Sequence, residues 1–309
     1  MRRRTALSAL LPAVLLTLQP VTGTASESGP APWRQVWADE FNGPAGRPPN
    51  PKFWTAEVGG HGWGNHELEF YTARPDNAHL DGSGHLVIEV RREPWEGMAY
   101  TSARLITRTK VAHRYGRFAA RIKLPTGRGI WPAFWMMGDD VEKVGWPRCG
   151  EIDVMEFLGH ESGTVYGTLH GPARESTTAD TDGVPDYDNG GGAGGSFTLD
   201  GGHRFPETFH EFAVEWEPES VRWLVDGKVY QTHGPKDVAP GKWVFDHPFF
   251  ILLNVAVGGD WPGPPDASTV FPQRMLVDWV RVEATTGVHG PPVRNAERAE
   301  CDAVPGPAQ

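Results

Sequence analysis

The sequence predicts an all-β fold, a sandwich of short strands joined by turns. Runs of apolar and aromatic residues, each about five to eight residues long, recur along the chain between turn signals. Glycine and proline account for 38 and 28 of the 309 residues, a composition that suits many tight turns. The sequence has no convincing long amphipathic helix and no internal repeat. Its length fits one large domain or two small ones, and all-β sandwiches of about 250 residues form single domains.

The first 25 residues have the pattern of a secretory signal. Arg2-Arg3-Arg4 is the positive region, and the apolar run 6–18 is too short to cross a bilayer comfortably. Small residues before Ser26 mark the expected cleavage site, and residues 26–32 are a predicted linker. We therefore expect a secreted protein that has no membrane anchor.

The net charge narrows the range of partners that the sequence predicts. The net charge of -10, with no basic cluster beyond the first residues, argues against nucleic acid as a partner. A neutral polysaccharide needs no charged protein surface.

Two cysteines, Cys149 and Cys301, are too few for a disulfide framework. We interpret Cys149 as a small buried side chain, although a bridge between the two stays open. A monomer is expected.

The strands of the first half follow from local patterns. Residues 116–124 alternate, so Phe118, Ala120 and Ile122 face one side while Arg117 faces the other. A glycine-dense loop with polar and aromatic groups occupies 59–71. The other strands expected in this half are 33–41, 85–92, 103–110 and 130–137.

The second half continues this pattern. Residues 151–158 and 249–257 are almost wholly apolar and predict central strands, whereas 164–170 alternates. Asp226-Gly227 predicts a hairpin turn. Strands are also expected at 208–216, on both sides of that turn within 221–230, and at 274–283. Residues 171–205 have no strand or helix periodicity, and a loop this long is usually functional or mobile. A polar tail covers 285–309.

One predicted strand carries three carboxylates, in Glu151-Ile152-Asp153-Val154-Met155-Glu156. Buried unpaired carboxylates are costly, so a purely structural strand rarely has three. Strict alternation puts Glu151 and Asp153 on one face and Glu156 on the other. A β-bulge of one residue would return Glu156 to the first face. Two alternatives follow. In the first, Glu156 points outward as an ordinary charge, and the acids belong to a solvated face or a calcium site. In the second, the bulge places all three carboxylates in one cleft.

The segments Trp131-Pro132-Ala133-Phe134-Trp135 and 146–156 closely resemble the active-site strand of glycoside hydrolase family 16. The likeness is greatest to bacterial laminarinases, endo-β-1,3-glucanases that have the same Glu-x-Asp-x-x-Glu pattern, whereas lichenases have one residue fewer. The resemblance covers residues 33–284, which we interpret as the catalytic domain. It implies a jelly-roll β-sandwich of two curved antiparallel sheets with a concave substrate cleft.

The resemblance also implies the chemistry. Glu151 matches the nucleophile, Glu156 the acid/base, and Asp153 the residue that assists the nucleophile by hydrogen bonding. These roles imply hydrolysis of internal β-1,3 bonds of laminarin-like β-glucans, with retention and with no cofactor. Because clustered acids cannot all ionise cheaply, we assign the retained proton to Glu156. Mixed-linkage β-1,3-1,4-glucan, another polysaccharide, or a non-catalytic β-glucan-binding lectin are the alternatives.

Sugar binding requires aromatic faces and polar groups for hydroxyls. Trp131 and Trp135, four apart on one strand, share a face. The family resemblance extends the predicted substrate-binding set to Asn65, Glu67, Arg104, Trp131, Trp135, His170 and Trp261.

A structural calcium site is a separate expectation. On the last strand, Asp278 shares a face with Val280 and Val282 under strict alternation, and a carboxylate among apolar neighbours needs a partner. The resemblance implies Ca²⁺ held by Asp278 and by the backbone carbonyls of Glu40 and Gly84, which are suitable oxygen ligands. An ordinary hydrogen-bonded aspartate is the alternative.

Overall fold

The structure is a computed structural model that describes residues 33–173, 186 and 193–285. The predicted signal and linker, Cys301, and all but the first residue of the predicted tail lie outside the described residues. Across the described ranges, no helix has the length and apolar character needed to cross a membrane.

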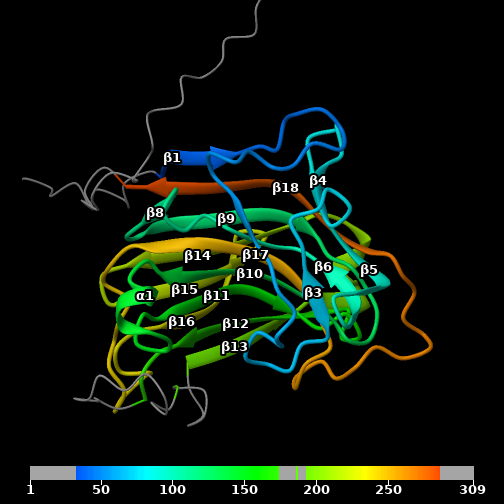
Figure 1. Ribbon diagram of the computed structural model, residues 1–309. Coiled ribbons are helices and arrows are strands. Elements are labelled where there is room, and N and C mark those ends of the chain that lie inside the picture. Colours follow the sequence, from blue (N-terminus) through cyan, green and yellow to red (C-terminus); the bar gives the residue numbers. More distant parts are fainter. Residues whose placement is uncertain (1–32, 174–185, 187–192, 286–309) are drawn as a thin grey trace, which may run out of the picture. The chain divides into compact units, whose positions relative to one another are not determined.

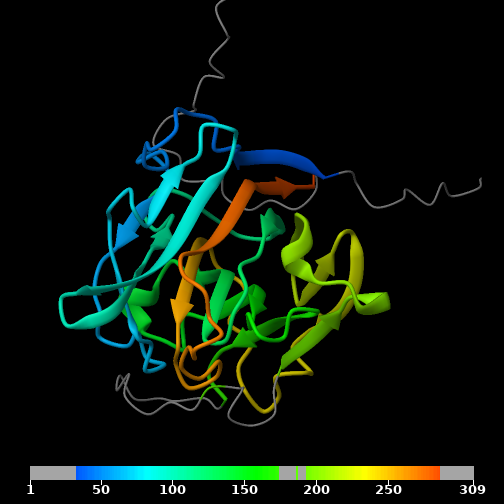
Figure 2. The ribbon, with the colours of Figure 1, turned by 90° about the vertical axis from the view of Figure 1, so that its right-hand side faces the viewer.

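Two β-sheets make up the fold, and both are mainly antiparallel (Figures 1 and 2). The first sheet has the order β16 (Lys228–His233), β15 (Ser220–Val225), β14 (His210–Glu217), β9 (Gly116–Lys123), β18 (Gln273–Ala284), β5 (Leu86–Trp95), β6 (Met98–Ser102) and β3 (Glu69–Tyr71). Two further strands join it: β1 (Arg34–Asp39) pairs with β18, and β4 (Ala78–Leu80) pairs with β5. Only the β3–β6 pair is parallel among the pairings described.

The second sheet carries the carboxylate strand near its middle. Its order is β13 (Ala193–Thr198), β12 (Thr164–His170), β11 (Glu151–Phe157), β10 (Ile130–Gly138), β17 (Phe249–Val257), β7 (Arg104–Ile106) and β2 (Thr55–Glu57), with β8 (Ala112–His113) on β17. Figure 1 shows β17, β10, β11, β12 and β13 succeeding one another down the view. The short helices are α1 (Val141–Val144), η2 (Asp200–Gly202) and η3 (Phe205–Glu207).

The hydrophobic core lies between the two sheets. Phe118 and Ile122 of β9 and Phe134 of β10 are buried in one continuous cluster, as the alternation in 116–124 predicts. Burying each such side chain contributes roughly 1.5–3 kcal/mol. Trp216 and Trp223 are the largest fully buried side chains of the described residues. The sandwich therefore buries one face of each sheet and leaves the outer face of the second sheet available for a site.

One predicted region differs from the structure. Residues 171–205 contain a strand, β13, which the sequence analysis did not predict. Its first four residues, 193–196, read Ala-Gly-Gly-Ser and have weak β-propensity. Tertiary pairing compensates, because every residue of β13 from Ala193 to Thr198 pairs with a residue of β12. A strand at the sheet edge needs only one partner, so its sequence pattern is correspondingly weak.

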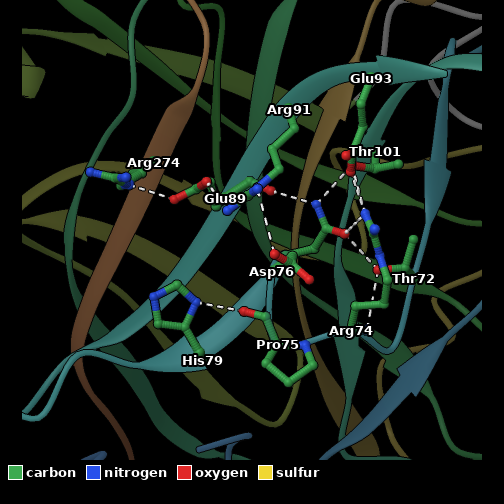
Figure 3. Close-up of polar contacts among 11 residues, drawn as sticks. Thr72, Arg74, Pro75, Asp76, His79, Glu89, Arg91, Glu93, Thr101 and Arg274 are labelled. Carbon is green, nitrogen blue, oxygen red and sulfur yellow. Dashed lines mark hydrogen bonds and ion pairs between the residues drawn. The ribbon is translucent and has the colours of Figure 1, made fainter. Parts of the chain in front are cut away.

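A buried polar network fastens the first sheet on the side of β5 (Figure 3). Glu89 is 2% exposed, and its carboxylate pairs with Arg91 at 2.8 Å and Arg274 at 2.6 Å. Asn77, also buried, donates to the Glu89 backbone carbonyl and to the Thr101 hydroxyl, both at 3.0 Å. A buried charge is tolerated when it is paired in this way. None of these residues lines the cleft described below, so we assign the network a structural role.

Candidate active site

A cleft of about 1220 Å³ lies on the outer face of the second sheet. Its lining comes from β7, β10, β11, β12, β13 and β17, from the loops at 63–67 and 260–261, and from the single residues Trp146 and Asp186. All residues predicted to act in catalysis or substrate binding contribute to it: Glu151, Asp153, Glu156, Asn65, Glu67, Arg104, Trp131, Trp135, His170 and Trp261. The fold therefore brings together residues that are far apart in the sequence.

A β-bulge on β11 gathers the three carboxylates. Along β10 the register passes from Phe134 opposite Met155 to Trp135 opposite Asp153, which leaves Val154 as the extra residue. The pairing with β12 shifts at the same place, between Asp153 and Glu156. The bulge returns Glu156 to the cleft face. The bulged alternative is confirmed, and the outward-charge alternative is wrong.

Both glutamates favour the protonated form. Burial, followed by the charge of Asp153, raises the pKa of Glu151 to about 8 and that of Glu156 well above its usual value. Each carboxylate also accepts a hydrogen bond from an indole: Trp146 Nε1 donates to Glu151 at 2.9 Å, and Trp131 Nε1 donates to Glu156 at 3.0 Å. At least one carboxyl group of the site therefore keeps its proton near neutral pH, as general acid catalysis requires.

His170 lies between two aspartates. Its Nε2 is 3.1 Å from Asp153 Oδ2, and its Nδ1 is 2.5 Å from Asp186 Oδ2. Burial opposes a charge on the ring, but the contacts with the carboxylates of Asp153 and Asp186 outweigh it and hold the pKa of His170 well above its usual value. Polar atoms of Glu151, Asp153 and His170 lie within 4.8 Å of one another. A metal ion would require His170 to be neutral, because an imidazolium has no free lone pair. The predicted His170 is thus an integral neighbour of the carboxylates.

Arg104 and Trp135 form part of the cleft floor. The Arg104 guanidinium lies 4.8 Å from the ring of Trp63 and 4.7 Å from that of Trp135, and its Nε donates to Glu57 at 2.6 Å. Trp135 is 8% exposed and donates from Nε1 to Asn254 at 2.7 Å. The stacked planar groups hold one another in place and present polar edges to the cleft.

The loop residues Asn65 and Glu67 are held by hydrogen bonds. Asn65 Nδ2 donates to Glu67 Oε1 at 3.2 Å, and the Tyr71 hydroxyl donates to Glu67 Oε2 at 3.1 Å. Glu67 is 5% exposed, so it is no ordinary surface charge. The Asp260 backbone N–H donates to the Asn65 carbonyl at 2.9 Å, which ties this loop to the one that carries Trp261.

Trp261 stands at the cleft wall and is 42% exposed. Its ring packs edge-on against Trp131 at 5.6 Å and Tyr166 at 5.0 Å. The chain reaches this position directly after β17 through Gly258 and Gly259, whose φ angles of 70° and 104° other residues rarely adopt. An exposed indole between two other rings offers an apolar face to a sugar.

Several other residues also line the cleft and were not predicted from the sequence, among them Trp63, Trp146, Tyr166, Asp186 and Asn254. Trp146 and Tyr166 had a detectable signal, because Trp146 directly precedes the carboxylate strand and Tyr166 shares an alternating face with His170. Asp186 had none, since it stands in a segment without periodicity.

The expected surroundings of Asp278 are wrong. A second bulge, between Val277 and Trp279 of β18, moves Asp278 off the apolar face to which Val280 belongs. Its carboxylate instead lies 2.5 Å from Arg121 Nη1, and the side chain is 30% exposed. Strict alternation failed here because a bulge changes which residues share a face.

The three predicted calcium ligands nevertheless come from neighbouring strands. Glu40 directly follows β1, whose Asp39 pairs with Val280, and Gly84 lies two residues before Leu86, which pairs with Val277. One carboxylate with two backbone carbonyls is an oxygen donor set that suits Ca²⁺. The ion would have to displace the Arg121 guanidinium from Asp278.

Cys149 is fully buried two residues before Glu151. Burial raises the pKa of its thiol to about 12, so the reactive thiolate does not form near neutral pH. This agrees with its interpretation as a small buried side chain.

A two-sheet sandwich with paired carboxylates on the floor of an aromatic cleft is the arrangement that a glycoside hydrolase requires. The chain belongs to glycoside hydrolase family 16, because the model described as "Glycosyl hydrolases family 16" matches residues 67–281. The chain is 41% identical to a beta-glucanase from Rhodothermus marinus, across 91% of this chain and 94% of the relative.

Solved structures agree with this assignment. The laminarinase catalytic domain from Thermotoga maritima is 46% identical, with a TM-score of 0.71 over 81% of this chain and 98% of that chain. The endo-beta-1,3-glucanase from Pyrococcus furiosus is also 46% identical, with a TM-score of 0.72 over 82% of this chain and 95% of that chain. The all-β jelly-roll prediction is therefore confirmed.

Proposed function

We propose that this protein is an endo-β-1,3-glucanase that hydrolyses laminarin-like β-glucans with retention at the anomeric carbon. The observation that carries the proposal is the bulged strand β11, which lines the floor of an aromatic cleft with Glu151, Asp153 and Glu156. The similar proteins named laminarinase and endo-beta-1,3-glucanase support the substrate class. The intact carboxylates argue against a lectin, which has no need of them.

The first step is glycosylation. Glu156 enters protonated and donates its proton to the departing glycosidic oxygen, which its raised pKa allows near neutral pH. Glu151 attacks the anomeric carbon from the opposite side as a carboxylate and forms a covalent glycosyl-enzyme. Burial also raises the pKa of Glu151, which opposes the ionised form that attacks. The neighbouring His170 charge and the Trp146 hydrogen bond act in the other direction and favour that form.

The second step releases the sugar. Once Glu151 is esterified, its negative charge is gone, so the pKa of Glu156 falls and its carboxylate can accept a proton from water. That water attacks the anomeric carbon and regenerates Glu151. Asp153 lies between the two, and its charge raises the pKa values of both glutamates.

Reducing-sugar release by residues 26–309 tests this proposal. Laminarin, barley mixed-linkage glucan, agarose and carboxymethylcellulose are compared, with Glu151→Gln as control. We expect release from laminarin that the control abolishes. Binding of laminarin without release would favour the lectin. Release from another polymer alone would keep the mechanism and replace the substrate. Rapid loss of viscosity relative to sugar release would distinguish endo from exo action.

We also propose that the protein is exported and that it is monomeric. The amino-terminal pattern of charged, apolar and small residues supports export. An exported product whose first residue is Ser26 would bear this out, whereas a cell-retained product that keeps Arg2-Arg3-Arg4 would contradict it. Sedimentation at micromolar concentration tests the monomer.

A structural Ca²⁺ at Asp278, Glu40 and Gly84 is a further proposal, supported by the register of β1, β5 and β18. The ion would link three strands of the first sheet and leave the chemistry of the cleft unchanged. We expect Ca²⁺ to raise the melting temperature of chelator-treated protein, and Asp278→Asn to abolish that rise. An unchanged melting temperature in the wild-type protein would exclude the site.

A further inference from the structure

Asp186 contributes a buried carboxylate next to the candidate site. Its side chain is 4% exposed, and its backbone forms an isolated antiparallel bridge with Pro172. Asp186 Oδ1 accepts a hydrogen bond from the Gly171 backbone N–H at 2.8 Å, and Oδ2 faces His170 Nδ1 at 2.5 Å. Both carboxylate oxygens are therefore engaged at the end of β12.

The contacts of His170 favour one protonation state of the ring when both neighbouring aspartates are ionised. Each ring nitrogen faces a carboxylate oxygen, of Asp186 on one side and Asp153 on the other. An ionised carboxylate only accepts hydrogen bonds, whereas a neutral imidazole has one donor and one acceptor nitrogen. A neutral ring would thus leave one carboxylate facing a lone pair. The doubly protonated imidazolium satisfies both contacts.

The surroundings of His170 contain few other charges. On the facing stretch of β13, residues 193–196 have no ionisable side chain. The ionisable groups around the ring among the described residues are Asp186 next to β12, Glu151 and Asp153 on β11, and Glu156 and Arg104 farther along the cleft. The positive charge of His170 therefore sits among carboxylates, and Asp186 is the one that lies outside the predicted catalytic trio.

We propose that Asp186 is a positioning residue for the hydrolytic reaction: it holds His170 doubly protonated against Asp153, and thereby keeps a positive charge beside Glu151 and Glu156. This inference rests on the proposed roles of the two glutamates. Asp186 touches neither glutamate in the described contacts, so it acts through His170.

The direction of the effect follows from the charges. The positive charge of His170 lowers the pKa values of Glu151 and Glu156, against the larger effects of burial and of Asp153. Without Asp186 the ring loses one of its two carboxylate partners and ionises less readily. Both glutamate pKa values then rise. Because Glu151 must be ionised and Glu156 protonated, the bell-shaped pH profile moves as a whole to higher pH.

The test compares Asp186→Asn with Asp200→Asn, which removes the same charge from an exposed position after β13. The pH dependence of kcat/KM on laminarin is measured for both and for the wild type. If both glutamate pKa values rise by about one pH unit, kcat/KM of Asp186→Asn falls about tenfold on the acid side and rises by a similar factor on the alkaline side. KM changes less than kcat, and Asp200→Asn follows the wild type. A uniformly lowered curve with unchanged midpoints would indicate a merely structural role and overturn the proposal.

Histidine NMR provides a readout that is independent of activity. The His170 resonance is identified by its loss in His170→Gln, and its titration is followed in the wild type and in Asp186→Asn. We expect an imidazolium at neutral pH in the wild type and a lower midpoint in the variant. An ordinary midpoint in the wild type would refute the inference even if the protein cleaves laminarin. Conversely, if His170 titrates as expected but no hydrolysis is detected, the proposed function is refuted and the role of Asp186 toward His170 is not.

A second variant covers the case in which Asp186→Asn does not fold. Asp186→Glu keeps the carboxylate and is expected to retain the wild-type midpoints in both experiments. Shifted midpoints in a folded Asp186→Glu protein would contradict a role that depends on the charge of Asp186.

Discussion

Trp146 donates a 2.9 Å hydrogen bond from Nε1 to Glu151 Oε2, although its ring is 45% exposed. The same ring lies 6.2 Å from that of His170. A hydrogen bond to the ionised carboxylate favours that form, so Trp146 partly offsets the burial that raises the pKa of Glu151 to about 8. This exposed aromatic residue therefore acts on the proposed nucleophile as well as lining the cleft.

Replacing Trp146 by phenylalanine separates these two effects. The ring face is kept for sugar contact, but the N–H donor is lost, so the pKa of Glu151 rises further. We expect the acid limb of the kcat/KM profile to move to higher pH, with a loss of roughly three- to tenfold on the acid side. KM for laminarin should change little. A large increase in KM without movement of the acid limb would show that the indole mainly binds sugar.

Glu156→Gln should spare substrates that need no proton. Polysaccharide hydrolysis should fall by about 10²–10⁴, the range typical of a lost general acid. An aryl β-glucoside oligomer with a good leaving group should still form the glycosyl-enzyme, and a burst of phenol should show it. Glu151→Gln should give no burst with either substrate. A burst from Glu151→Gln and none from Glu156→Gln would reverse the two roles.

Much of the site could be predicted because its signals are local. The acids of β11 stand out against apolar neighbours, and a single bulge suffices to align them. Trp131 and Trp135 share a face by simple alternation, and the alternation in 116–124 identifies the inner face of β9. These features depend on strand geometry, which the sequence pattern records directly.

The rest depended on tertiary pairing that leaves little trace in the sequence. β13 is a strand because β12 offers its edge, despite adjacent glycines at 194 and 195. Asp186 reaches His170 through a single isolated bridge to Pro172. A bulge at Asp278 reverses the face that alternation assigns to it. Short strands such as β2, β3 and β8, of two or three residues, lack the length for any period to show.

Arg104→Lys should weaken substrate binding. The planar guanidinium stacks between Trp63 and Trp135 and donates to Glu57, and a lysine ammonium cannot stack in this way. We expect KM for laminarin to rise about tenfold, equivalent to about 1.4 kcal/mol, with a smaller change in kcat. Arg274→Lys, whose partner Glu89 lies outside the cleft, is the matched control. Equal effects of both variants would indicate loss of stability and no specific role for Arg104.

The raised pKa of Glu151 also predicts that this residue lowers the free energy of unfolding near neutral pH. In the unfolded chain this carboxyl ionises near 4.5, and in the folded protein near 8. Between these values folding takes up a proton, so the stability that the neutral group contributes below about pH 4.5 is lost as the pH rises toward 8. Glutamine is neutral throughout and can still accept the Trp146 hydrogen bond. The loss of stability with rising pH should therefore disappear in Glu151→Gln.

Thermal unfolding of Glu151→Gln and the wild type at two pH values measures this effect. At about pH 7.5 the variant should be more stable by about 2–4 kcal/mol, which corresponds to a rise of several degrees in melting temperature. At about pH 5 the difference should shrink to less than about 1 kcal/mol, because the unfolded carboxyl is then only partly ionised. Glu207→Gln, an exposed glutamate outside the cleft, should show no such pH dependence. A stabilisation that is the same at both pH values would mean that Glu151 is not held protonated, and its role in the cleft would then rest on geometry without the proposed shift in acidity.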